Sequence, residues 1–167
     1  MPPLYLRETR PIELSAVPPA LHEAIAAWGA RHQVALDSVS AWHTHSVNPP
    51  GEGLFARLLG RRANPVDPDT EHDAVLVLHP THLIVGTLGA RRGVSVLGVP
   101  LMQCSVTRGS LLAARLGGAA PTEDGITLSG FPGAEGRPGT YFFGLGGAGS
   151  DACFAAVESA VRARKNP

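Results

Sequence analysis

The sequence predicts an α+β fold in which about seven antiparallel strands form a barrel or sandwich, with a C-terminal amphipathic helix closing it. Short apolar runs recur from residue 74 onward, and breaks rich in Gly and Pro separate them. Segments with helical apolar spacing lie before and after these runs. Runs at this spacing are typical of antiparallel strands, and the first helix is an addition in front of them.

The chain has 167 residues, a length that favours one domain with its own hydrophobic core. Within it we expect an N-terminal arm and helix over residues 1–38, followed by the barrel and the C-terminal helix over 39–167. We interpret residues 48–73 as a long insertion, because they are rich in Pro, Gly and charge and exceed an ordinary connection.

Charge and cysteine content narrow the class of protein. The 14 Lys and Arg residues balance the 14 Asp and Glu residues, so the chain lacks the broad positive field of a nucleic-acid binder, and nucleic acid is not an expected partner. Two cysteines cannot form a disulfide framework. The sequence has no signal-peptide pattern and no apolar run of membrane-spanning length. We therefore expect a cytoplasmic protein without a transmembrane segment.

The expected elements follow from apolar spacing. A helix is predicted over 18–32, where Leu21, Ile25 and Trp28 share one face, and a strand over 39–47. Further strands are predicted at residues 74–79, 82–88, 93–97, 101–107, 110–116, 125–129 and 140–145. The final helix has Ser150 as its predicted N-cap, and its apolar stripe comprises Phe154, Val157 and Val161.

Several apolar strings follow one another in a familiar order: AVLVL at 74–78 leading to LIV at 83–85, VPL at 99–101, and YFFGL at 141–145 running into the final helix. In this order, over residues 39–165, the chain resembles bacterial pleckstrin-homology-like domains. The resemblance implies a seven-stranded barrel whose loops at one open end form the ligand rim. Eight candidate strands are present, so either 110–116 continues its predecessor after a bend or the fold is another α+β arrangement. Phosphoinositide-binding members carry basic residues on the first two strands, and residues 42–45 and 74–76 offer none.

Basic residues gather in two segments that the resemblance would place at that open end. One follows an apolar island at helical spacing, and the other is a tight loop between two predicted strands. The candidate contact residues are Leu54, Phe55, Arg57, Arg61, Arg62, Arg91 and Arg92. The alternative interpretation is that the island packs on the barrel and presents a solvated arginine face.

Two histidines are weak candidates for a metal site. His43 and His45 alternate with Trp42 on the predicted strand 39–47, so both imidazoles point to the same face. No fixed motif supplies a third ligand, although a neighbouring strand could bring His79 close. Structural histidines are the alternative. We expect Cys104 and Cys153 to pack as small hydrophobic residues.

A GxGxxG string at 144–149 lies between a predicted strand and the final helix. Too few residues follow it to supply the second strand and acidic residue of a dinucleotide site, so we expect no dinucleotide and interpret it as a flexible turn. The residues favour a non-catalytic binding module that contacts a protein, peptide or anionic surface and uses no cofactor. The alternative is a small metal-dependent or cysteine-dependent enzyme with a site assembled from scattered His and Cys.

Overall fold

The computed structural model describes residues 3–110 and 123–166, which form two antiparallel sheets and three α-helices. The five-stranded sheet contains β1 (Leu6–Ile12), β2 (Ser40–Val47), β3 (Glu71–Leu78), β4 (His82–Gly89) and β5 (Gly93–Pro100), in that spatial order. The second sheet contains β6 (Ser105–Arg108), β7 (Gly125–Pro132) and β8 (Pro138–Gly144). The helices are α1 (Pro19–His32), α2 (Leu54–Leu58) and α4 (Ser150–Lys165), and short 3-10 turns occur at Leu14–Ala16 and Ala134–Gly136.

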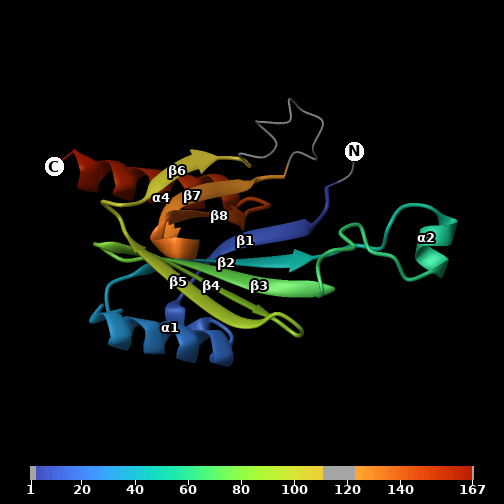
Figure 1. The fold of residues 1–167 in the computed structure, drawn as a ribbon, viewed down its shortest axis with the longest axis horizontal. Helices are drawn as coiled ribbons and strands as arrows, with labels where there is room; N and C mark the ends of the chain where they lie inside the picture. Colours follow the sequence, from blue (N-terminus) through green and yellow to red (C-terminus); the bar gives the residue numbers. More distant parts are fainter. Residues whose placement is uncertain (1–2, 111–122, 167) are drawn as a thin grey trace.

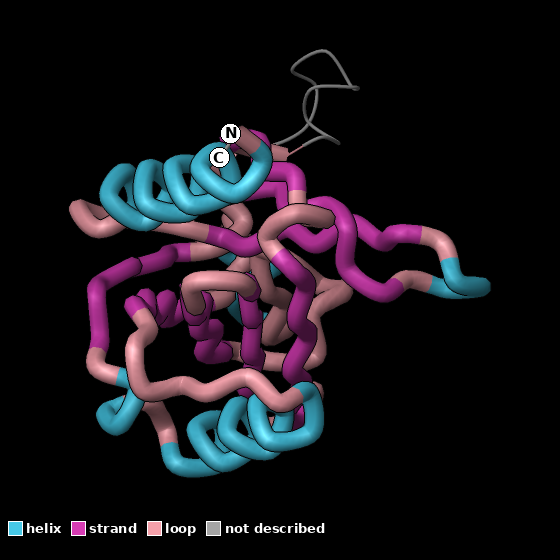
Figure 2. Tube along the Cα trace, turned by 90° about the vertical axis from the view of Figure 1, so that its left-hand side faces the viewer, coloured by secondary structure: helices cyan, strands magenta, loops and turns pink. Residues whose placement is uncertain are grey.

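The elements form layers, with the five-stranded sheet in the middle. Helix α1 covers one face of that sheet, and the second sheet and α4 lie beyond the other face (Figure 1). Turning the molecule by 90° shows α4 and α1 on opposite sides, with strands between them (Figure 2). The alternation of a strand produces this division, because Leu76 of β3 packs in the core between the sheets while Val75 and Val77 pack against α1.

These observations confirm the predicted α+β class with antiparallel strands and a C-terminal amphipathic helix. The predicted helix over 18–32 is confirmed within one residue. Its predicted apolar face, Leu21, Ile25 and Trp28, is buried. Within residues 3–110 and 123–166 the strands form two separate sheets rather than one closed barrel.

Strand β1 is absent from the sequence prediction, which assigned its residues to an arm. It pairs antiparallel with β2 from Leu6 opposite Val47 to Ile12 opposite Ala41. The Thr9 amide also donates to the carbonyl oxygen of Gly146 at 2.8 Å, and the Gly146 amide donates to Thr9 Oγ1 at 3.0 Å. The first strand is therefore held between β2 and the segment that leads into α4.

The GxGxxG segment provides the surface on which β1 lies. A Cβ atom at Gly146 would overlap the carbonyl oxygen of Arg7, and one at Gly149 would overlap that of Thr9. Glycine is needed here because it lets two backbones approach closely. The interpretation as a flexible turn is therefore incomplete, since these glycines make a defined packing contact.

Two local predictions are corrected, and a third falls almost wholly outside the described residues. Residues 101–103 form a turn, and only Ser105–Arg108 continues as a strand, because β5 already extends to Pro100. The predicted strand at 110–116 lies outside the described residues from position 111 onward. The N-cap of α4 is Gly149 rather than Ser150, because the Ser150 hydroxyl contacts the Asp124 carboxylate and accepts a hydrogen bond from Arg108 at 2.8 Å.

Candidate functional site

The connection between β2 and β3, residues 48–70, forms an arm that projects away from both sheets with α2 near its end (Figure 1). Its two limbs are joined at the base, where Asn48 Nδ2 donates to Asn64 O at 2.8 Å and Asn64 N donates to Asn48 Oδ1 at 3.0 Å. Further out, the Gly51 amide donates to Arg61 O at 2.7 Å. The arm is thus an ordered, hydrogen-bonded element.

We call residues 54–62 the tip of the arm. Its large apolar side chains are Leu54, Phe55, Leu58 and Leu59, and between 68% and 82% of each is exposed. The alternative interpretation, that this island packs on the body of the domain, is wrong. The side chains of the tip are exposed to water because the arm carries them away from the core. Helix α2 ends near Gly60, which adopts a left-handed conformation with φ of +65°.

The candidate arginines differ in what they contact. Arg57 belongs to α2, and Arg61 and Arg62 follow it as exposed residues. Arg62 Nη1 donates to Asn48 O at 3.2 Å, so that side chain lies along the arm. Arg91 is exposed on the turn between β4 and β5. Because turns alternate between the two ends of an antiparallel meander, this turn and the arm leave the same end of the sheet.

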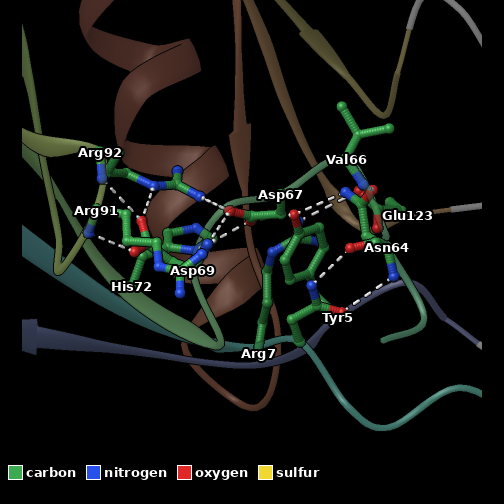
Figure 3. Close-up of polar contacts among 11 residues, drawn as sticks. Tyr5, Arg7, Asn64, Val66, Asp67, Asp69, His72, Arg91, Arg92 and Glu123 are labelled. Atoms are coloured by element: carbon green, nitrogen blue, oxygen red, sulfur yellow. Dashed lines mark hydrogen bonds and ion pairs between the residues drawn. The ribbon is translucent and has the colours of Figure 1, made fainter. Parts of the chain in front are cut away.

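Arg92 serves to hold the β4–β5 turn against the returning limb of the arm. Its Nε donates to Asp69 Oδ2 at 2.8 Å, its Nη2 contacts Asp67, and the Arg91 amide donates to Asp69 Oδ1 at 2.6 Å. Figure 3 shows these groups around the two carboxylates. The side chains of Asp67 and Asp69 are only 2% exposed.

Tyr5 extends this polar cluster to the N-terminal segment. Its hydroxyl donates to Asp67 and accepts from Asn64 Nδ2 at 2.8 Å (Figure 3). Burial and the hydrogen bond to Asp67 raise the pKa of Tyr5 to about 12. Burial acts to raise the pKa of Asp67, but hydrogen bonds from Tyr5, the Asp69 amide and Arg92 outweigh it and hold the pKa below its usual value. The cluster fixes the base of the arm to the domain.

The predicted metal candidates lie together on β2, and both contact one carboxylate of β3. His43 Nε2 is 2.8 Å and His45 Nδ1 is 3.0 Å from Asp73 Oδ1. His79 is not their neighbour, because β2 and β3 run antiparallel and place Leu78 opposite Ser40, at the far end. Among the described residues, no group of three or more His, Cys, Asp or Glu side chains has a metal-binding arrangement.

Both cysteines are fully buried, as their positions on apolar faces predict. Burial raises the pKa of Cys104 to about 11 and that of Cys153 to about 12. Since the thiolate is the nucleophilic form, neither thiol has the environment of a reactive cysteine. The geometry thus offers no support for the cysteine-dependent alternative.

Comparison of the chain with protein-family models, curated proteins and solved structures found no match. None of the helices in the described part of the chain is long and apolar enough to cross a membrane. The functional conclusion therefore depends on the exposed tip and the polar cluster at its base.

Proposed function

We propose that the protein is a non-catalytic binding module that docks reversibly on an anionic lipid surface through the tip of its arm. The observation that carries this proposal is the exposure of four large apolar side chains at the end of an ordered arm. Exposed apolar groups of this size on a soluble surface mark interaction sites, and here exposed arginines follow them directly.

The dimensions of α2 favour a lipid surface over a groove on another protein. Grooves that accept a helix read anchors over at least two turns, whereas α2 has five residues. A bilayer interface requires no matching shape, so adjacent apolar residues at 54, 55, 58 and 59 can all enter it. The exposed Arg61 and Arg62, and Arg91 at the same end of the sheet, suit anionic headgroups.

The expected affinity is modest. Moving a Leu or Phe side chain fully out of water contributes about 1.5–3 kcal/mol, so partial insertion of four contributes several kcal/mol. Each arginine near an anionic surface adds about 1 kcal/mol. A sum of this size supports reversible docking rather than permanent anchoring, because part of it offsets the entropy lost on binding.

The pleckstrin-homology-like resemblance remains a prediction. Two antiparallel sheets followed by a C-terminal helix are compatible with it, as is the presence of both basic segments at one end of the five-stranded sheet. Contact with lipid through an apolar tip does not require the basic first strand of phosphoinositide-binding members, which this chain lacks.

Vesicle co-sedimentation tests the proposal. The wild-type protein is mixed with phosphatidylcholine vesicles with and without phosphatidylglycerol, beside a Leu54→Ser, Phe55→Ser variant and an Arg61→Ala, Arg62→Ala variant. Met102→Ser is the matched control, because Met102 is 69% exposed and lies in the turn after β5, away from the arm. We expect wild type and control to bind the anionic vesicles more tightly than the neutral ones, and both tip variants to bind the anionic vesicles at least about tenfold more weakly.

Three outcomes would overturn the proposal. Equal binding to both vesicle types would remove the role of the arginines, and undiminished binding by the Leu54→Ser, Phe55→Ser variant would place the contact elsewhere. If no vesicle binds and the tip instead crosslinks to a protein partner, the lipid surface is the wrong occupant. Folding does not confound these results, because substitutions of exposed side chains change stability by about 0.5 kcal/mol or less.

A further inference from the structure

A cavity of about 450 Å³ lies beside the polar cluster, in the size range of small-molecule sites. Its walls come from segments far apart in the sequence: the start of β1, the beginning of β3, the short segment before β7, and β8. The side chains that matter for its chemistry are Arg7, His72, Glu123, Tyr141 and Phe142. The cavity is separate from the tip, although the returning limb of the arm forms part of its wall.

Both guanidinium groups among the described lining residues are already paired. Arg7 lies over the Tyr5 ring at 4.5 Å from its centre, and its Nη2 is 3.2 Å from Glu123 Oε2. Arg92 is held by Asp67 and Asp69. An anionic ligand would therefore meet carboxylates without gaining a cation, so the cavity does not suit one.

Two polar atoms of the cavity walls have no hydrogen-bond partner among the described residues. His72 Nδ1 and Glu123 Oε1 are buried and make no hydrogen bond with any described group. The closest acidic group to His72 Nδ1 is Asp67 Oδ2, at 3.7 Å, beyond hydrogen-bonding distance. Buried polar atoms in folded proteins nearly always have partners, so two of them at one cavity indicate a place for a hydrogen-bonding ligand.

The chemistry of these atoms defines what the ligand must offer. Burial, with a smaller effect from Arg92, lowers the pKa of His72 to about 4, so the imidazole is neutral near pH 7 and its Nδ1 can accept a hydrogen bond. A carboxylate oxygen such as Glu123 Oε1 only accepts. The ligand must therefore donate. Tyr141 and Phe142 add aromatic surface to the wall, which favours a flat ring.

We propose that this cavity binds a flat aromatic molecule whose edge carries amidine-type or amine-type N–H donors. One donor pairs with Glu123 Oε1 and another with His72 Nδ1, while the ring contacts the aromatic wall of β8. The site goes beyond lipid docking and does not depend on it, because none of the exposed side chains of the tip lines the cavity.

Binding of three test ligands of nearly equal shape distinguishes a ligand with N–H donors from a neutral or an anionic one. Benzamidine carries two N–H donor groups and a positive charge, benzamide is neutral with one donor group, and benzoate is an anion without donors. The wild-type protein is titrated with each while its amide NMR spectrum is recorded. We expect saturable binding in the order benzamidine, benzamide, benzoate, with shifts concentrated at His72, Glu123, Tyr141 and Phe142. Tighter binding of benzoate, or no saturable binding of benzamidine, overturns the proposal.

Two variants test the acceptors individually. Glu123→Gln keeps the size of the side chain but removes its charge, and His72→Phe keeps a ring but removes the acceptor. We expect each to weaken benzamidine binding about tenfold, in line with the loss of one charge-assisted or buried hydrogen bond. The control is Glu158→Gln, on an α4 carboxylate that pairs with Arg162 outside the cavity and should leave the affinity unchanged.

The location of the wild-type shifts keeps the proposal testable even if a variant unfolds, because shifts confined to other surfaces contradict it. The Leu54→Ser, Phe55→Ser variant separates this proposal from lipid docking. It should bind benzamidine as the wild type does while losing vesicle binding. A loss of benzamidine binding in that variant would contradict the independence of the two sites.

Discussion

The indole ring of Trp28 lies against the backbone of Gly98 on β5, leaving no space for a Cβ atom between them. Trp28 is 7% exposed and joins α1 to the sheet together with Leu21 and Ile25. The absence of a side chain at Gly98 thus sets the distance between the helix and the strand.

We predict that Gly98→Ala lowers the free energy of unfolding by about 1–3 kcal/mol, because the added methyl group overpacks the interface. Trp28→Phe removes the part of the ring that the methyl group would meet. The double variant should therefore lose less unfolding free energy than the sum of the losses in the two single variants. Urea unfolding of all four proteins measures this coupling, and strict additivity would show that the two residues do not interfere.

The glycines between β8 and α4 give a second stability test. Gly146→Ala should destabilise the protein by several kcal/mol, because its methyl group would overlap the Arg7 backbone, which cannot move away as a flexible side chain could. Gly147→Ala is the matched control. Gly147 has φ of +68°, and a Cβ there would meet Glu8 only at ordinary van der Waals distance, 3.8 Å, so alanine costs only about 1 kcal/mol of backbone strain. Similar melting temperatures for the two variants would contradict the close approach of β1.

Protonation of His72 should make the protein less stable in acid. Its pKa in the folded protein is about 4, below the ordinary value of 6.5, mainly because of burial. The unfolded chain therefore takes up this proton at a higher pH than the folded protein does. The stability that comes from keeping His72 neutral is fully present above pH 6.5 and is lost as the pH falls toward 4. The free energy of unfolding then decreases by at most about 3 kcal/mol.

Urea unfolding across this pH range, with His72→Phe beside the wild type, isolates the effect of one imidazole. The difference in unfolding free energy between the two proteins should shift in favour of the variant as the pH falls. A constant difference at every pH would show that His72 takes up its proton equally well in the folded protein and the unfolded chain.

Salt should weaken vesicle binding without abolishing it. The screening length shortens from about 10 Å at 0.1 M salt to about 3 Å at 1 M, which reduces the attraction between exposed arginines and anionic headgroups. The apolar contribution of Leu54 and Phe55 remains. Measured by co-sedimentation, the Arg61→Ala, Arg62→Ala variant should show a smaller salt dependence than the wild type. An identical salt dependence would exclude these arginines as the charged contact.

The elements with strong apolar periodicity could be predicted from the sequence. Helix α1, helix α4 and the β4–β5 hairpin were found within a few residues, because each buries a regular apolar face. Strand β1 could not be found in this way. It contains Pro11 and three charged residues, and its most buried side chain is Thr9, whose hydroxyl lies 2.8 Å from that of Thr44. A polar strand at the edge of a sheet has no apolar alternation to reveal it.

The candidate sites were predicted unequally. The apolar island at residues 54–59 was visible as helical spacing, but only the structure shows that it is exposed. The cavity was missed, because its walls come from distant segments and Glu123 lies in a Gly-rich loop where a carboxylate is usually solvated. The one local signal was the Asp67-Pro68-Asp69 string, whose carboxylates bind Arg92 on the neighbouring turn.

The contact of β1 with the glycine segment has a consequence for the order of folding during synthesis. Thr9 and Gly146 are 137 residues apart, so the first strand emerges from the ribosome long before the surface on which it finally lies. Until then only β2 can pair with it, and its other edge stays open. Closing so long a loop is slow, which makes the docking of β1 on Gly146 a late step in folding. A nascent chain that stops before residue 144 would therefore carry an unprotected strand edge, the feature that chaperones and aggregating chains both recognise.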